Sequence, residues 1–273
     1  MVLQKREYRK YTEDEKSIRN DDIFKIVFGS NERSQYLKEL LESILHEKIT
    51  NIVIRNDVAL NKVHADNKLM RLDILAEINY NEKVNIEFQN KNEYNLFERS
   101  EVYASGIYYN SLRVGDKYMQ ATKTIVIWIL GFNVFKDGTY HEIARTKRDF
   151  NDKELTNNIT YHYIQLPKFL EQVKEIKTPE EQWLAYLSGS LNKEEMEELF
   201  KMNRSIEEIN EIVDIVMTDA DVRDALNERI LAENLEALKR EKAFEDGKKE
   251  VAQKMLEKEK RQRDVLNPKS WTV

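Results

Sequence analysis

The sequence predicts an α/β protein in which helices flank a mixed sheet and further helices follow. Two neighbouring segments, MRLDILAEI and KVNIEFQ, alternate apolar and polar residues with the period of two that is typical of strands. A third segment, TKTIVIWIL, is continuously apolar and rich in β-branched residues, as expected of a strand that is covered on both faces. Helical patterns separate these segments and become the only pattern beyond about residue 178.

The composition favours a soluble globular protein and excludes several kinds of chemistry. No apolar run in the 273 residues approaches the roughly 20 needed to span a bilayer, so we expect a cytoplasmic protein without membrane contact. The absence of Cys excludes disulfides and thiolate zinc sites, and His64 and His141 have no partner at ligand spacing. Glycine-rich nucleotide-binding motifs are also missing. Any metal ion would therefore be bound by oxygen ligands.

Patterning and charge predict four regions. Residues 1–20 lack periodicity and are expected to form a flexible arm, 21–178 the α/β core, 179–263 a helical annex and 264–273 a disordered tail. The first part of the annex, 179–235, has 5 basic and 15 acidic side chains and thus a net charge of −10. Because DNA would repel this charge, the annex suits a protein partner better, including a second copy of the chain.

The core begins with two helices and a strand. Asp22 is positioned to cap a helix that Gly29 ends. Apolar residues then recur at helical spacing over 34–47, which predicts an amphipathic helix. We expect a strand over 52–60, and 61–68 has the composition of a polar loop.

The two alternating segments predict a hairpin. Their apolar residues share a face when paired residue numbers sum to 160, which leaves a tight loop at 79–81. This register places Asp73 opposite Glu87, with Gln89 one step along the same face. Since no Lys or Arg in the segment neutralises both carboxylates, the pair favours a divalent cation such as Mg²⁺. The alternative is that these polar residues form the solvent-exposed face of the strands.

The remaining elements follow the same two patterns. We expect a helix over 94–112 and strands over 122–130, 140–145 and 159–165. Thr178 and Glu181 form a capping box around Pro179, which predicts the first helix of the annex. Further helices are expected over 193–202, 206–217 and 221–245.

Five motifs occur in a fixed order along the chain: D-I-F-K-I-V-F-G (22–29), L-D-I-L-A-E (72–77), N-I-E-F-Q (85–89), F-E-R-S-E-V-Y (97–103) and G-D-K-Y (115–118). In this order they resemble the Rpn family of recombination-promoting nucleases, often labelled transposases, within the PD-(D/E)XK nuclease superfamily. The resemblance spans about residues 20–180. It implies that the core has the restriction-endonuclease-like fold.

The resemblance also implies a metal site at the hairpin. Asp73 and Glu87 match the metal-binding carboxylates, and the carbonyl of Phe88 would face the same ion, Mg²⁺ or else Mn²⁺ or Ca²⁺. Gln89 stands where most of the superfamily has Lys, and its amide can orient a water but cannot supply positive charge. Asp22 matches an acidic residue of the first helix that would contact a metal ion, unless it only caps the helix.

Three residues of the motifs are candidates for substrate binding. Lys25 would meet a phosphate or replace the missing cation, the alternative being an ordinary surface lysine. Arg99 and Tyr103 lie one helical turn apart, so they face the same direction. They would contact phosphate, or else form a structural pair.

The implied function is a metal-dependent DNA endonuclease that hydrolyses phosphodiester bonds in recombination or in mobile elements. Its partner would be DNA, and the C-terminal helices would support a homo-oligomer. The alternative is a catalytically inactive DNA-binding or protein-interaction relic of a transposase-like element.

Overall fold

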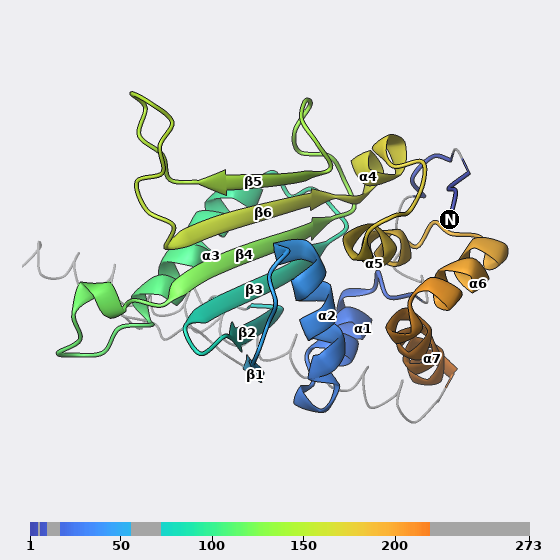
Figure 1. Ribbon diagram of the computed structural model, residues 1–273, viewed down its shortest axis with the longest axis horizontal. Coiled ribbons are helices and arrows are strands. Elements are labelled where there is room, and N and C mark those ends of the chain that lie inside the picture. Colours follow the sequence, from blue (N-terminus) through green and yellow to red (C-terminus); the bar gives the residue numbers. More distant parts are fainter. Residues whose placement is uncertain (5, 10–16, 56–71, 219–273) are drawn as a thin grey trace, which may run out of the picture. The chain divides into compact units, whose positions relative to one another are not determined.

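A six-stranded mixed sheet lies between two layers of helices (Figure 1). The computed structural model describes residues 1–4, 6–9, 17–55 and 72–218. The strands have the order β1-β2-β3-β4-β6-β5, with parallel pairs at the centre and antiparallel pairs towards both edges. They are β1 (Ile52–Arg55), β2 (Ile74–Ile78), β3 (Glu82–Gln89), β4 (Lys123–Leu130), β5 (His141–Arg145) and β6 (Ile159–Gln165).

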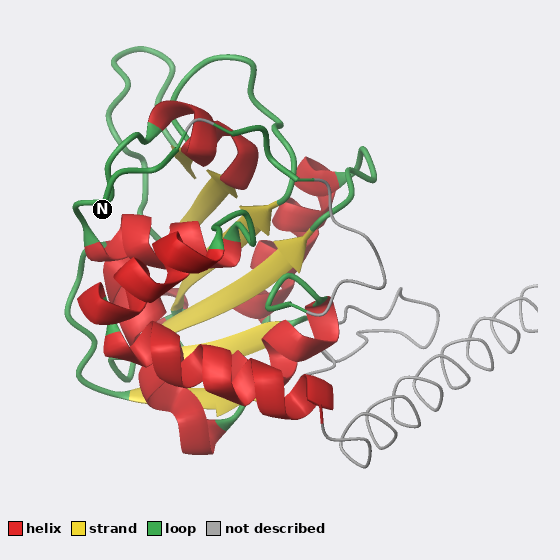
Figure 2. Cartoon of the chain, turned by 90° about the vertical axis from the view of Figure 1, so that its right-hand side faces the viewer, coloured by secondary structure: helices red, strands yellow, loops and turns green. Residues whose placement is uncertain are grey.

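The two faces of the sheet are covered unequally (Figures 1 and 2). The helix α3 (Leu96–Tyr109) packs on one face, where Ala104 contacts a small core that includes Trp128 and Leu130. The larger core covers the other face. Its helices are α1 (Asp21–Phe28), α2 (Ser34–Leu45), α4 (Leu166–Gln172), α5 (Pro179–Leu187), α6 (Lys193–Met202) and α7 (Arg204–Thr218). Two short 3₁₀ turns complete the elements, η1 (Asn31–Arg33) and η2 (Tyr118–Gln120).

The β2–β3 hairpin has the register predicted from its alternating residues. Ile74 pairs with Ile86, and the pairing continues to Ile78 and Glu82. The loop contains Asn79 and Tyr80 with φ of 50° and 63°, the left-handed conformation that tight hairpin loops require. Apolar residues at even positions of both strands join the larger core. The odd positions therefore face α3, and Glu87 is one of them.

Helix α1 begins two residues earlier than a cap at Asp22 would imply. The Asn20 side chain accepts hydrogen bonds from the backbone nitrogens of Asp22, at 3.0 Å, and Ile23, at 3.2 Å. Asn20 is therefore the cap that we had assigned to Asp22, and Asp22 lies in the first turn of the helix.

The described residues at the beginning of the chain pack against the body, unlike the flexible arm that we predicted for residues 1–20. The Leu3 backbone nitrogen donates to the Lys174 carbonyl at 2.9 Å, and the Ile176 nitrogen donates to the Met1 carbonyl at 2.8 Å. Leu3 and Ile18 are both buried in the larger core. Sequence patterning missed this packing because two separated apolar residues carry no periodicity.

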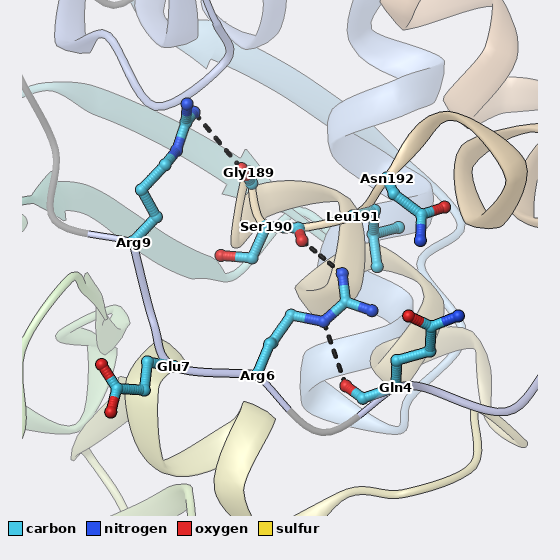
Figure 3. Close-up of a pocket in the computed structure, with 8 residues that line it drawn as sticks. All are labelled: Gln4, Arg6, Glu7, Arg9, Gly189, Ser190, Leu191 and Asn192. Carbon is cyan, nitrogen blue, oxygen red and sulfur yellow. Dashed lines mark hydrogen bonds between the residues drawn. The ribbon is translucent and has the colours of Figure 1, made fainter.

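Two arginines extend these contacts to the link between α5 and α6. Arg6 donates to the Ser190 carbonyl and forms an ion pair with Glu195, while Arg9 reaches the Gly189 carbonyl at 3.5 Å. Figure 3 shows these side chains around a pocket of about 380 Å³. Both guanidinium groups point towards backbone carbonyls of the link, so they fasten the N-terminal segment to α6.

No domain boundary lies at the predicted position, residue 178. Trp183 on α5 is buried in the larger core, and its ring meets that of Phe28 edge-on at 6.0 Å between centroids. One compact unit extends from Met1 to Met217. The capping box itself is present, since Thr178 Oγ1 accepts from the Glu181 nitrogen at 3.2 Å. The change in composition at 178 therefore marks a change of element type within one core.

Several expectations concern residues outside the described ranges. They are the end of the strand over 52–60, the loop over 61–68, the helix over 221–245 with its extension to 263, and the tail over 264–273. In the described ranges, no helix is both long and apolar enough to cross a bilayer.

Candidate active site

The two predicted carboxylates lie side by side where β2 begins and β3 ends. The Asp73 backbone nitrogen donates to Glu87 Oε1 at 3.1 Å, and the Phe88 nitrogen donates to Asp73 Oδ2 at 3.3 Å. The N–H and C=O of one strand residue point to the same side, so the Phe88 carbonyl also points towards β2 and Asp73. The Gln89 carbonyl points the other way, to the Gly131 nitrogen at 2.9 Å.

Glu87 is buried and Asp73 is largely covered, and burial opposes the ionisation of both. The Glu87 residue is 2% exposed, beneath α3, and burial followed by the nearby charge of Asp73 raises its pKa. Burial also raises the pKa of Asp73, and the charge of Asp21 adds to the effect. Asn85 opposes the shift at Glu87 by donating its side-chain N–H to Oε1 at 3.0 Å. Two ionised carboxylates are therefore costly here unless cations accompany them.

Lys25 supplies one such cation from helix α1. Its Nζ lies 3.0 Å from Asp73 Oδ1 and 2.9 Å from Asp21 Oδ2. Although burial by itself lowers the pKa of Lys25, the charges of Asp73 and Asp21 raise it above the ordinary value. Lys25 is thus not an ordinary surface lysine, and the acidic pair is not uncompensated as its local sequence suggested.

A second cation comes from α3. Arg99 Nη2 lies 3.6 Å from Glu87 Oε2, and Nη1 donates to Gln89 Oε1 at 3.2 Å. Tyr103, one turn further on, accepts a hydrogen bond from Arg99 at 3.4 Å. The structure therefore brings together six residues that sequence reasoning had drawn from four separate motifs: Lys25, Asp73, Glu87, Gln89, Arg99 and Tyr103.

Asp21 takes the place near the pair that we had predicted for Asp22. Successive residues of a helix differ by about 100° in direction, so an error of one position changes the face. Asp21 Oδ1 is buried and accepts no hydrogen bond within the part of the chain that the structure describes. The spacing of four between Asp21 and Lys25 was the available signal, because such pairs share a helix face.

The donor set suits a hard divalent cation. Asp73 and Glu87 offer adjacent carboxylate oxygens, the Phe88 carbonyl faces the same side, and Asp21 has an unused buried oxygen. Among the described residues, however, no three His, Cys, Asp or Glu side chains already surround one point as metal ligands. In this structure the cationic groups of Lys25 and Arg99 are the partners of the negative charges of Asp73 and Glu87.

Two further residues of the site were not predicted. Asn85 shares the face of Glu87 two positions along β3, a relation that the period-two pattern contained. Trp128 is the register partner of Glu87 on β4, and the guanidinium of Arg99 stacks over its ring at 5.0 Å. Only the parallel pairing of β3 with β4 brings Trp128 next to Glu87, and local sequence patterns do not specify that pairing.

One comparison with known proteins identifies the family of the chain. A family model described as PD-(D/E)XK nuclease family transposase matches residues 18–243. Neither the curated proteins nor the solved structures gave a match. The mixed sheet with its flanking helices is consistent with the PD-(D/E)XK fold, and the match extends over the helices that follow residue 178.

Proposed function

The chain belongs to the PD-(D/E)XK nuclease family transposases, and from this premise we propose that it is a divalent-metal-dependent endonuclease that hydrolyses DNA. Membership supports a nuclease or transposase-like role, and the metal, the DNA substrate and cleavage are our proposal. The observation that carries it is the direct contact of Asp73 and Glu87 at the junction of β2 and β3, in a buried site. A link to recombination or mobile elements agrees with the family description.

Asp73, Glu87 and the Phe88 carbonyl would hold the ion, Mg²⁺ or in its place Mn²⁺ or Ca²⁺. When bound, such an ion supplies Lewis acidity towards a phosphate oxygen and lowers the pKa of a water. The chain positions its own ligands: Asn85 and the Asp73 nitrogen fix one oxygen of Glu87, and the Phe88 nitrogen fixes one oxygen of Asp73.

Lys25, Arg99 and Tyr103 would bind the substrate around these ligands. The side chains of Lys25 and Arg99 are 36% and 28% exposed, so each cation is accessible from solvent while it contacts a carboxylate. A DNA phosphate could therefore meet both cations without displacing the buried pair. Asp21, whose buried oxygen has no hydrogen-bond partner among the described residues, replaces Asp22 as the acidic residue of α1 in this proposal.

The second candidate function is a DNA-binding or protein-interaction relic without catalysis. It is favoured by one observation: each carboxylate already has a cationic partner, and the described residues contain no ready group of three acidic or His ligands. In this case the helices after residue 178 would carry the function. A homo-oligomer formed through them stays a prediction.

Cleavage of plasmid DNA distinguishes the two candidates. Purified full-length protein is incubated with supercoiled plasmid and Mg²⁺, Mn²⁺ or Ca²⁺, beside an EDTA control. Asp73→Asn and Glu87→Gln remove a ligand charge while preserving shape. Glu77→Gln is the matched control, because Glu77 lies on β2 but pairs at the surface with Arg55 at 2.7 Å.

We expect metal-dependent nicking by the wild type and by Glu77→Gln at similar rates. Asp73→Asn and Glu87→Gln should each be slower by on the order of 1,000-fold, as for the loss of a main electrostatic group at an active site. Folded wild-type protein that is inert with every ion would overturn the nuclease proposal. Equal activity in all variants would trace any nicking to a contaminant.

A further inference from the structure

The side-chain amide of Gln89 is engaged at both ends. Its Nε2 donates to the Lys91 carbonyl at 2.8 Å, and its Oε1 accepts from Arg99 Nη1 at 3.2 Å. Only this orientation of the amide satisfies both partners, because a carbonyl cannot donate and a guanidinium cannot accept. In this arrangement the amide does not face the carboxylates as a water-orienting group. It anchors Arg99 to the loop that follows β3.

The guanidinium of Arg99 is fixed from several sides at once. Its carbon lies 5.0 Å from the centroid of the Trp128 ring and 5.6 Å from that of Tyr103. Stacking on aromatic faces restricts a planar guanidinium, and the Gln89 oxygen fixes its rotation in that plane. Held in this way, Nη2 lies 3.6 Å from Glu87 Oε2.

We propose that Gln89 is a positioning residue that holds Arg99 as the positive charge of the site, directed at a non-bridging oxygen of the DNA phosphate. This inference rests on the proposed function. Both cations contact two carboxylates, Lys25 those of Asp73 and Asp21 and Arg99 those of Glu87 and Glu93, so the distinction between them lies in the shape of the cationic group. Arg99 has five N–H donors in a planar fork, which matches a phosphate better than an ammonium does.

The arrangement also explains why the residue at position 89 is uncharged. A lysine there could not accept a hydrogen bond from Arg99 and would repel it at a distance of a few ångström. A neutral acceptor allows the cation to come from α3, where it stacks over Trp128. Gln89 and Arg99 therefore act as one unit, and substitution of either should affect the other.

The positioning step is tested by NMR of ¹⁵N-arginine-labelled protein, which reports the Arg99 side chain without any need for catalysis. Arg99→Lys assigns its signal. In Gln89→Leu we expect the Arg99 Nε–H signal to shift and to exchange faster with water. Glu93→Gln is the matched control: Glu93 also contacts Arg99, at 3.2 Å, but is 60% exposed and should matter little. An unchanged Arg99 signal in Gln89→Leu would overturn the positioning role.

The catalytic step is tested with the plasmid assay. We expect Arg99→Ala to cleave about 100-fold more slowly than the wild type, and added guanidinium ion to restore part of the rate. Gln89→Leu should lose roughly 10-fold, with Glu93→Gln within twofold. If the wild type cleaves plasmid and Arg99→Ala cleaves it equally fast, the inference is refuted while the nuclease function stands. An inert wild type would remove the proposed function and the catalytic part of the inference, and the NMR result would still decide the positioning part.

Discussion

Two groups of ionisable side chains lie in different parts of the protein, one at the junction of β2 and β3 and one around β5, β6 and α5, and they differ in how their charges are matched. In the carboxylate site two groups of like charge are neighbours: the Asp73 backbone N–H donates to Glu87 Oε1, and the charge of Asp73 adds to the raised pKa of Glu87. The histidine cluster (His46, His141, His162 and Glu180) places its carboxylate among imidazoles. Glu180 lies 2.6 Å from His141 Nδ1 and 3.4 Å from His46 Nε2, and His141 Nε2 lies 2.9 Å from His162 Nδ1.

In the carboxylate site the neighbouring groups disfavour each other's ionisation, whereas in the histidine cluster the carboxylate has imidazole partners. In the histidine cluster, burial and then the charge of His141 lower the pKa of His162 to about 3, so this ring stays neutral and completes a hydrogen-bonded chain. In the carboxylate site, burial raises both acidic pKa values. Only the carboxylate site, whose acidic pKa values stay raised although Lys25 and Arg99 contact it, would gain from a further cation. This difference supports the proposal that the carboxylate site carries the function and that the histidine cluster has a structural role.

The largest difference between the two groups should appear in DNA cleavage. Glu87→Gln is expected to slow cleavage by on the order of 1,000-fold, whereas His141→Gln should leave the rate within twofold at a temperature where both are folded. Initial rates of plasmid nicking measure this difference. A strong loss of activity in folded His141→Gln would contradict the division of roles.

Stability, unlike cleavage, should depend more on the histidine cluster than on the carboxylate site. Glu180→Ala leaves His141 and His46 without their carboxylate, and we expect a loss of about 1–3 kcal/mol. Urea unfolding at neutral pH in EDTA measures it. Glu180→Gln retains an acceptor and should lose less. No loss in Glu180→Ala would mean that the cluster does not stabilise the fold.

The pH dependence of stability should reveal the cost of the carboxylate pair. Because folding raises the pKa values of Asp73 and Glu87, the folded state binds more protons than the unfolded state above the ordinary carboxyl pKa. The stability contributed by the pair is therefore present at low pH and is lost as pH rises through the folded values, with a slope of at most about 1.4 kcal/mol per pH unit for each proton.

Thermal unfolding in EDTA between pH 4 and 9 tests this sign. Glu87→Gln should have a higher Tm than the wild type at the alkaline end, and the difference should shrink towards pH 4. Mg²⁺ should narrow it at alkaline pH by stabilising the wild type. A wild type that gains stability relative to Glu87→Gln as pH rises in EDTA would contradict the raised pKa values.

The smallest effect is expected at the surface of the same hairpin. Arg55 and Glu77 form an exposed pair at 2.7 Å across β1 and β2. Arg55→Ala should change the free energy of unfolding by no more than about 0.5 kcal/mol, because exposed pairs are solvated and screened. A larger decrease in the free energy of unfolding, measured with urea, would show that the exposure of an ion pair does not by itself predict its contribution to the stability of this sheet.

Sequence patterning predicted the features of the structure that depend on residues close together in the chain. The alternation in β2 and β3 specified the pairing of Ile74 with Ile86 and hence the contact of Asp73 with Glu87. Cap chemistry specified where α5 begins, at Pro179 directly after the Thr178 cap. The family motifs added Lys25 and Arg99, but not which carboxylate each would contact.

What the patterns did not contain depends on long-range packing. Trp128 meets Arg99 only because β4 lies parallel to β3. His141 finds His162 on the neighbouring strand β6 and Glu180 on α5. Such partners are determined by the tertiary arrangement, so no local spacing could have indicated them.

The position of Trp183 limits how this protein can be divided. Its ring fills the core against Phe28, so a fragment that ended at residue 178 would lose an aromatic wall of the α1 packing site. Such a fragment would expose apolar surface and is expected to aggregate. The smallest fragment suitable for expression or for exchange between relatives should therefore extend at least to Met217, where the compact unit ends.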